Sequence, residues 1–282
     1  MRPGWRSLLF VPANAPQRWA RAHTRGADCI IIDLEDSTQA DAKAAARPFA
    51  TDAIRTLASH GAEVIARINN DPAFLAADLA AIAVPGLRAV VLPKVEEAVE
   101  LDALDARLAA LETAQGLARN TFAVLAVIES PRALERLAAI ADGPRLIGIA
   151  LGSEDFSLSL GRRPTPLALD LACSQVAYAA SARNLMGVGM ACGIGNFTDL
   201  EAWSAEASRA HAMGLTGAMC IHPAQIAALN TAFAPSEHEL SEARAILAAW
   251  ETRKGGVVSH NGQMLDQPVV ERARRLIQSA RA

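Results

Sequence analysis

Short apolar segments alternate with longer alanine-rich segments along most of this chain. Several of the short segments, such as residues 29–32 and 90–92, are apolar throughout. Such continuous runs are typical of parallel strands buried on both faces, whereas strands of a half-exposed sheet alternate apolar with polar residues. The longer segments have the wider apolar spacing of amphipathic helices. The pattern therefore predicts an α/β fold in which helices join parallel strands.

The number of these strand–helix units indicates the architecture. The expected strands cover residues 8–11, 29–34, 63–68, 89–92, 122–128, 146–151, 185–190 and 218–221. The expected helices cover residues 15–25, 41–59, 72–82, 96–113, 168–182, 199–212 and 223–232, with one more opened by Pro131. Eight such units in a chain of this length predict a TIM (β/α)8 barrel. A doubly wound open sheet is the alternative fold.

The pattern changes after residue 234. Ser236 is placed as the N-cap of a further helix that runs to about residue 253. Two glycines then interrupt it, residues 257–266 read as a loop or hairpin, and Pro268 begins a last helix. We therefore expect a catalytic barrel over residues 1–234 and a C-terminal helical extension over residues 235–282.

Composition and charge exclude several classes of partner. Hydrophobic residues make up 51% of the 282 residues, and 27 Lys and Arg against 30 Asp and Glu give a net charge of −3. Without a basic excess to neutralise phosphates, we expect neither a nucleic-acid nor a membrane-surface partner. No apolar run approaches the roughly 20 residues that cross a bilayer.

The four cysteines form neither a CxxC pair nor a zinc-like spacing; they are Cys29, Cys173, Cys192 and Cys220. We expect them to be free thiols packed inside a cytoplasmic protein.

Charged residues follow almost every expected strand. In barrel enzymes the chemistry lies at the carboxyl ends of the strands, so these residues are expected to share one rim. They are Asp33, Glu35 and Asp36 after the second strand, Arg67 at the end of the third, Lys94 after the fourth, Glu129 at the end of the fifth, Glu154 and Asp155 after the sixth, and His222 at the end of the last.

So many carboxylates at one rim would repel each other strongly unless a cation lay between them. Mg²⁺ is typically held by one or two carboxylates, waters and substrate oxygens. Glu129 and Asp155 come from neighbouring strands and are the candidate metal ligands, with Glu35 and Asp36 beside them as candidate substrate contacts. Arg67 lies across the rim, where its planar guanidinium is suited to a substrate carboxylate.

Each of these residues also has a structural interpretation. Any single acidic residue at a strand end could cap the helix that follows it. Arg67 could form a structural ion pair with Asp33 or Asp36 instead of binding substrate. His222 could only orient a loop, and Lys94 could be a cap or a phosphate contact.

Several short motifs occur in a fixed order along the chain. They are Arg-Ser-Leu-Leu-Phe-Val-Pro at residues 6–12, Asp-Leu-Glu-Asp at 33–36, Arg-Ile-Asn at 67–69, Pro-Lys-Val-Glu at 93–96, Ile-Glu at 128–129, Gly-Ser-Glu-Asp-Phe at 152–156 and Ile-His-Pro-Ala-Gln-Ile at 221–226. In this order they resemble the citrate lyase β-subunit family, within the wider group of HpcH/HpaI-type aldolases and malyl-CoA lyases. The resemblance extends over almost the whole chain.

The resemblance implies a TIM barrel with Mg²⁺ on Glu129 and Asp155 and with Arg67 on the substrate carboxylate. It also implies an acyl-CoA thioester substrate and a homo-oligomer, either a trimer or a hexamer. In similar lyases an aspartate of a neighbouring subunit's C-terminal segment completes the site, which makes Asp266 the candidate acid/base. Arg21, and less directly Arg18, are the candidates for contacting the CoA phosphates.

The sequence departs from the family pattern in three places. Ala13 stands where glycine is usual, Ala218 where lysine is common, and Ser153 at a variable small-residue position. The metal and arginine positions are intact, so these departures bear on the thioester and on CoA affinity rather than on the chemistry.

The activity that follows is cleavage of a 3-hydroxy-3-carboxyacyl-CoA to an acyl-CoA and a 2-keto acid. Citryl-CoA, citramalyl-CoA and malyl-CoA are the substrates considered, and the sequence does not choose among them. One alternative is a metal-dependent aldolase of hydroxy-keto acids that needs no CoA, and another is a non-catalytic subunit of a larger lyase complex. Thioester hydrolysis or condensation at the same site also remains open.

Overall fold

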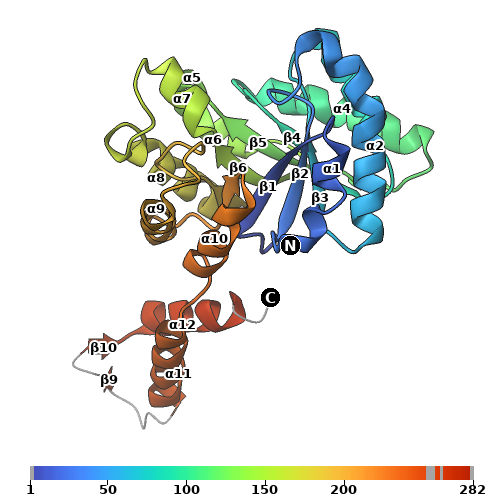
Figure 1. Ribbon diagram of the computed structural model, residues 1–282. Coiled ribbons are helices and arrows are strands. Elements are labelled where there is room, and N and C mark those ends of the chain that lie inside the picture. The colour runs from blue at the N-terminus through green and yellow to red at the C-terminus, as the bar shows by residue number, and fades with distance from the viewer. Residues whose placement is uncertain (1–2, 252–257, 261–262, 280–282) are drawn as a thin grey trace. The chain divides into compact units, whose positions relative to one another are not determined.

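Eight parallel strands form one sheet in the order β7-β6-β5-β4-β3-β2-β1-β8, as the computed structural model shows (Figure 1). The structure describes residues 3–251, 258–260 and 263–279. The strands are β1 Ser7–Pro12, β2 Cys29–Asp33, β3 Val64–Arg67, β4 Leu87–Leu92, β5 Ala123–Ile128, β6 Leu146–Leu151, β7 Met186–Val188 and β8 Ala218–Cys220.

The two ends of this sheet meet, so the sheet is a barrel. β8 pairs with β1 through Ser7 and Ala218. On its other side, a parallel bridge joins Val188 of β7 to Gly217, and the Gly189 N–H donates to the Gly217 carbonyl at 3.0 Å. The prediction of a TIM barrel is therefore confirmed, and the open sheet is wrong.

Helices surround the strands in Figure 1. They are α1 Pro16–Trp19, α2 Lys43–Ser59, α3 Pro72–Ile82, α4 Ala98–Ala114, α5 Pro131–Glu135, α6 Leu137–Ala141, α7 Ser153–Ser159, α8 Pro166–Ala182, α9 Leu200–Ala212 and α10 Ile226–Ala232, with the short 3₁₀ helices η1 Ala22–Thr24, η2 Ala40–Ala42 and η3 Pro223–Gln225. The sequence pattern did not predict α7, which begins two residues after β6 ends.

The interior of the barrel is filled by alternate residues of the strands. Leu8, Ile31, Val91, Val127 and Val188 all belong to this buried cluster. Because successive residues of a strand point to opposite faces, the next inward-facing position on each strand lies two residues further on. The last inward-facing side chains of the strands therefore lie above the apolar core, at the rim formed by the carboxyl ends of the strands.

The chain divides into two compact units, Met1–Thr231 and Ala232–Ala282. In the second unit, α11 Glu237–Glu251 packs against α12 Gln267–Ser279, and β9 Val258–His260 pairs antiparallel with β10 Gln263–Leu265. Ser236 caps α11, since its hydroxyl accepts a hydrogen bond from the Glu239 N–H at 3.2 Å. The cap and the hairpin agree with the sequence pattern.

None of the helices in the described part of the chain is long and apolar enough to cross a membrane. The four cysteines are free, as expected, and three of them are buried.

Candidate functional site

A cavity of about 460 Å³ opens at the carboxyl ends of the strands. This volume is within the range of pockets that bind small ligands. Its lining includes Asp33, Arg67 and Glu129. Each of them lies two residues along the chain from a residue of the buried barrel core. The strand period therefore places these three side chains in the mouth of the barrel rather than against the outer helices.

Arg67 is held by three carboxylates. Its Nε and Nη2 donate to the two oxygens of Asp33 at 2.7 and 2.8 Å. Its Nη1 lies 2.8 Å from Glu35 Oε2 and donates to Asp36 Oδ2 at 3.3 Å. The guanidinium also lies over the Phe10 ring, 4.6 Å from its centroid. The structural ion pair considered from the sequence is thus present. The edge of the Arg67 guanidinium that was expected to bind a substrate carboxylate with two hydrogen bonds binds Asp33 instead.

The electrostatics of this group favour full ionisation of Asp33 and Arg67. Burial opposes the charge on Asp33, but the hydrogen bonds from Arg67 outweigh it and hold the pKa of Asp33 below its usual range. Burial likewise opposes the charge on Arg67, yet the hydrogen bond and charge of Asp33 and the charges of Glu35 and Asp36 raise its pKa. Arg67 is therefore a permanent cation fixed in position.

Lys94 connects the two sides of the rim. Its backbone N–H donates to Glu129 Oε2 at 2.6 Å, and its ammonium group donates to Glu35. Its φ of +53° lies in the left-handed region, which is strained for a residue with a side chain. Strain of this kind often marks functional sites. This arrangement is not the cap considered for Lys94, and the phosphate contact stays a prediction.

Glu129 is 7% exposed and accepts this hydrogen bond from Lys94. Burial, followed by the negative charges of Glu35 and Asp155, raises the pKa of Glu129 to about 8. Its carboxyl group lies directly over Gly152, where a Cβ atom would come within 2.5 Å of Glu129 Oε1. The glycine is thus required for this position of the carboxylate.

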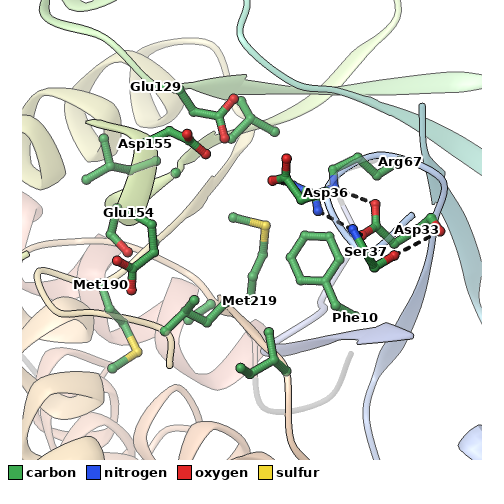
Figure 2. Close-up of a pocket in the computed structure, with 18 of the residues that line it drawn as sticks. Phe10, Asp33, Asp36, Ser37, Arg67, Glu129, Glu154, Asp155, Met190 and Met219 are labelled. Carbon is green, nitrogen blue, oxygen red and sulfur yellow. Dashed lines mark hydrogen bonds and ion pairs between the residues drawn. The ribbon is translucent and has the colours of Figure 1, made fainter. Parts of the chain in front are cut away.

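Asp155 and Glu154 belong to the first turn of α7. Figure 2 shows Glu129, Glu154 and Asp155 on one side of the cavity and Asp33, Asp36 and Arg67 on the other. We call Arg67 and the carboxylates that it contacts, Asp33, Glu35 and Asp36, the Arg67 group. Glu129 and Asp155 lie beside each other in Figure 2, and the charge of Asp155 contributes to the raised pKa of Glu129. Among the described residues, none of Glu129, Glu154 and Asp155 forms an ion pair with a basic side chain.

The charges around this cavity do not balance. Asp33, Glu35 and Asp36 face Arg67 and Lys94, while Glu129 and Asp155 add two further carboxylates. With Glu154 and Arg18, which also line the cavity, six carboxyl groups stand against three basic side chains, an excess that a divalent cation would largely offset. In the described part of the chain, no cluster of three or more His, Cys, Asp or Glu side chains is arranged to hold a metal. The protein therefore offers a pair of carboxylates, which suits Mg²⁺ completed by water and substrate oxygens.

The remaining sequence candidates lie in three different places. Arg18 is exposed and lines the cavity, whereas Arg21, the stronger candidate from the sequence, is not among the lining residues. Asp266 belongs to the second unit and caps α12, because its Oδ1 accepts from the Val269 N–H at 3.1 Å. His222 caps η3 through a hydrogen bond from the Ala224 N–H, in agreement with a loop-orienting role.

Three features of the site were missed in the sequence. They are the Lys94 N–H, the contact of Gly152 with Glu129, and an apolar portion of the lining that includes Met190 and Met219. Met190 lies two residues after Val188, so the strand period would have found it. The other two depend on a backbone conformation and a packing distance that have no signal in the sequence.

Comparison with known proteins identifies the family. Residues 6–223 match the model of the HpcH/HpaI aldolase/citrate lyase family, and residues 181–282 match that of a C–C bond lyase of the TIM-barrel fold. The chain belongs to the HpcH/HpaI aldolase/citrate lyase family. It is therefore a member of a family of carbon–carbon lyases, as the ordered motifs indicated.

Two curated relatives of this family member illustrate the range of activities. The citrate lyase subunit beta of Leuconostoc mesenteroides subsp. cremoris is 34% identical over 98% of this chain and 93% of that protein. The L-malyl-CoA/beta-methylmalyl-CoA lyase of Cereibacter sphaeroides (strain ATCC 17025) is 31% identical over 98% of this chain and 94% of that protein.

A solved structure supports the same assignment. Protein CitE from Mycobacterium tuberculosis, in complex with magnesium, acetoacetate and coenzyme A, superposes with a TM-score of 0.79. The two chains are 30% identical, and the match covers 98% of each.

Proposed function

We propose that this family member is a Mg²⁺-dependent lyase that cleaves a 3-hydroxy-3-carboxyacyl-CoA into an acyl-CoA and a 2-keto acid. The observation that carries the proposal is the pair of uncompensated carboxylates, Glu129 and Asp155, across the cavity from a fixed guanidinium, Arg67. This is the arrangement that a substrate with adjacent carboxylate and hydroxyl groups would need. The magnesium and coenzyme A bound to the M. tuberculosis CitE structure are in keeping with it.

The donor set fits Mg²⁺. Carboxylate oxygens are hard ligands, and the raised pKa of Glu129 shows that its charge lacks compensation in the metal-free protein. Glu129 and Asp155 would hold the ion. When bound, it supplies Lewis-acid stabilisation of the oxygen that becomes the keto group.

The side chains around the ion position the substrate. Two N–H groups of Arg67 make no hydrogen bond to Asp33 or Asp36; the one on Nη1 lies beside Glu35 Oε2, and the one on Nη2 would bind a substrate carboxylate. Asp36 lines the same side of the cavity, and Glu35, which does not line it, joins Asp36 in fixing the guanidinium. The positive charge of Arg67 would stabilise the negative charge that develops as the bond breaks.

The reaction only moves a proton and an electron pair within the substrate. The hydroxyl group gives up its proton, the bond to the thioester α-carbon breaks, and the electron pair of that bond becomes an enolate. The enolate then takes up a proton, so no oxidant or co-reactant is consumed. We assign this proton transfer to Asp266, a carboxyl group that is exposed at the start of α12.

The remaining expectations become part of this proposal. We propose a homo-oligomer, a trimer or a hexamer, in which the C-terminal extension over residues 235–282 supplies Asp266 to the barrel of a neighbouring subunit. Arg18 at the cavity, with Arg21 nearby in the sequence, would contact the CoA phosphates. The four free cysteines suit a cytoplasmic setting.

The test is turnover of a panel of CoA thioesters by the purified full chain with Mg²⁺, with products identified by mass spectrometry. Cleavage that EDTA and Glu129→Gln both abolish would support the proposal. Cleavage of free hydroxy-keto acids but not of their thioesters would instead show a CoA-independent aldolase. A protein that binds neither Mg²⁺ nor any thioester would be a non-catalytic subunit.

A further inference from the structure

The rim of the barrel is polar on one side and apolar on the other. β2 and β3 end at the charged side chains Asp33 and Arg67, and Glu129 directly follows β5. β7, β8 and β1 are consecutive around the barrel, and the cavity-lining residues that they and their following turns contribute are largely apolar. We name these residues the apolar wall: Phe10, Met190, Ile194, Met219 and Ile221.

The apolar wall faces the proposed reaction centre. Figure 2 shows the Met219 side chain pointing into the cavity between the Glu129–Asp155 pair and Phe10, with Met190 next to Glu154. Met219 follows Ala218, which also lines the cavity and is 1% exposed.

The cations near the reaction centre are already committed. Arg67 uses three of its five N–H groups on Asp33 and Asp36, and its Nη1 also faces Glu35. The Lys94 ammonium pairs with Glu35 and lies 3.8 Å from Asp36. The N–H group of Arg67 that is not used in these contacts would bind one substrate carboxylate. A second carboxylate would face the apolar wall, where burial of an unpaired charge is costly.

We infer that the carbon atom whose bond is cleaved carries a short alkyl group, a methyl group in the simplest case, beside its hydroxyl and single carboxylate. This inference rests on the proposed function and selects among its substrates. The 2-keto acid product then has one carboxylate and an apolar substituent. Met219 and Met190 are the residues that set this specificity, since methionine side chains adapt to small apolar groups.

Arg18 is the one other cation that lines the cavity within the described residues. It is exposed and belongs to α1, so its position suits the thioester arm that leaves through the open side of the cavity. If Arg18 instead held a second carboxylate, Arg18→Gln would weaken the cleavage of a dicarboxylate substrate selectively. If Arg18 contacts the CoA part of the substrate, Arg18→Gln would weaken the cleavage of all the thioesters alike.

The experiment compares three thioesters that differ in one substituent of the cleaved carbon: hydrogen in malyl-CoA, methyl in citramalyl-CoA and carboxymethyl in citryl-CoA. With Mg²⁺ and the full chain, we expect kcat/KM to be highest for the methyl compound and at least about 100-fold lower for the carboxymethyl compound, because its second charge lacks a partner. Equal or faster cleavage of citryl-CoA would overturn the inference. Cleavage of none of the three would overturn the proposed function itself.

A substitution in the apolar wall tests the assignment of Met219. Met219→Ala should reduce the preference for methyl over hydrogen by roughly fourfold, the effect of losing contact with about one methyl group. The matched control is Leu171→Ala, an exposed apolar residue of α8 that is not part of the cavity lining. An unchanged methyl-to-hydrogen ratio in Met219→Ala would show that Met219 does not set the specificity.

Discussion

The backbone N–H of Lys94 donates a 2.6 Å hydrogen bond to Glu129, and the ammonium group of the same residue pairs with Glu35. One residue therefore positions a proposed metal ligand and a member of the Arg67 group. Lys94 makes this hydrogen bond with a left-handed φ of +53°. The main chain and the side chain of Lys94 have separate roles, which substitution can separate.

We predict that Lys94→Gly is more stable than Lys94→Ala by about 1 kcal/mol, because only alanine retains the strain of the left-handed conformation. Both variants keep the N–H and lose the ammonium group, so both should still bind Mg²⁺. Chemical denaturation measures the stability difference, and calorimetry measures the Mg²⁺ affinity. If both variants lost Mg²⁺ binding equally, the ammonium group and not the N–H would be what positions Glu129.

Gly152 should be as important to the metal site as the ligands themselves. In Gly152→Ala the new Cβ would lie 2.5 Å from Glu129 Oε1, so the carboxyl group must move. We expect at least a tenfold loss of Mg²⁺ affinity, roughly what is seen when a neighbouring group that orients a metal ligand is removed. The control is Gly195→Ala, since a Cβ at Gly195 meets nothing within 4 Å. A normal Mg²⁺ affinity in Gly152→Ala would contradict the role of this contact.

The buried carboxyl group of Glu129 predicts how stability depends on pH in the metal-free protein. Burial and the charges of Glu35 and Asp155 raise its pKa from 4.5 to about 8. Because the folded state holds this proton more tightly, the contribution to stability is fully present below the unfolded pKa and is lost as the pH rises through about 8. We expect the melting temperature to fall over this range in EDTA, and Glu129→Gln to remove this part of the fall.

Mg²⁺ should compete with the same proton. Below pH 8 the ion displaces a proton from Glu129, so its affinity should rise with pH and level off above about 8. Calorimetry in two buffers of different ionisation enthalpy measures the released proton. Mg²⁺ binding without proton release at pH 7 would show that Glu129 is already ionised there.

The sequence was sufficient for the barrel and for the main charged residues of the rim. Eight strands were recognisable because each is mostly apolar and mostly buried, and Arg67 ends β3 while Glu129 directly follows β5, both at inward-facing positions. Helix α7 was missed because its seven residues carry no full amphipathic repeat. The ion pair of Arg67 with Asp33 was one of the two alternatives that the sequence left open, whereas the left-handed conformation of Lys94 depends on tertiary contacts that no local pattern contains.

A buried ion pair far from the rim provides a last prediction. Arg145 precedes β6 and pairs with Glu112 of α4, and each side chain is 1% exposed. Burial opposes the charge of Glu112, but hydrogen bonds from Arg145 and from the Phe122 N–H outweigh it and lower the pKa of Glu112. Stability from this group is thus present above the unfolded pKa and is lost as the pH falls through the folded value.

Glu112→Gln would leave the Arg145 guanidinium buried beside a neutral amide, with Asp105 as its remaining carboxylate. We expect a loss of about 3 kcal/mol in the free energy of unfolding at neutral pH, typical of a broken buried pair. Glu63→Gln, which breaks the exposed pair with Arg88, should cost less than about 1 kcal/mol. Denaturant titration at pH 7 and pH 4 distinguishes the two pairs, because the Glu112→Gln difference should shrink in acid. A difference that stayed constant with pH would mean that the charge of Glu112 is not what stabilises Arg145.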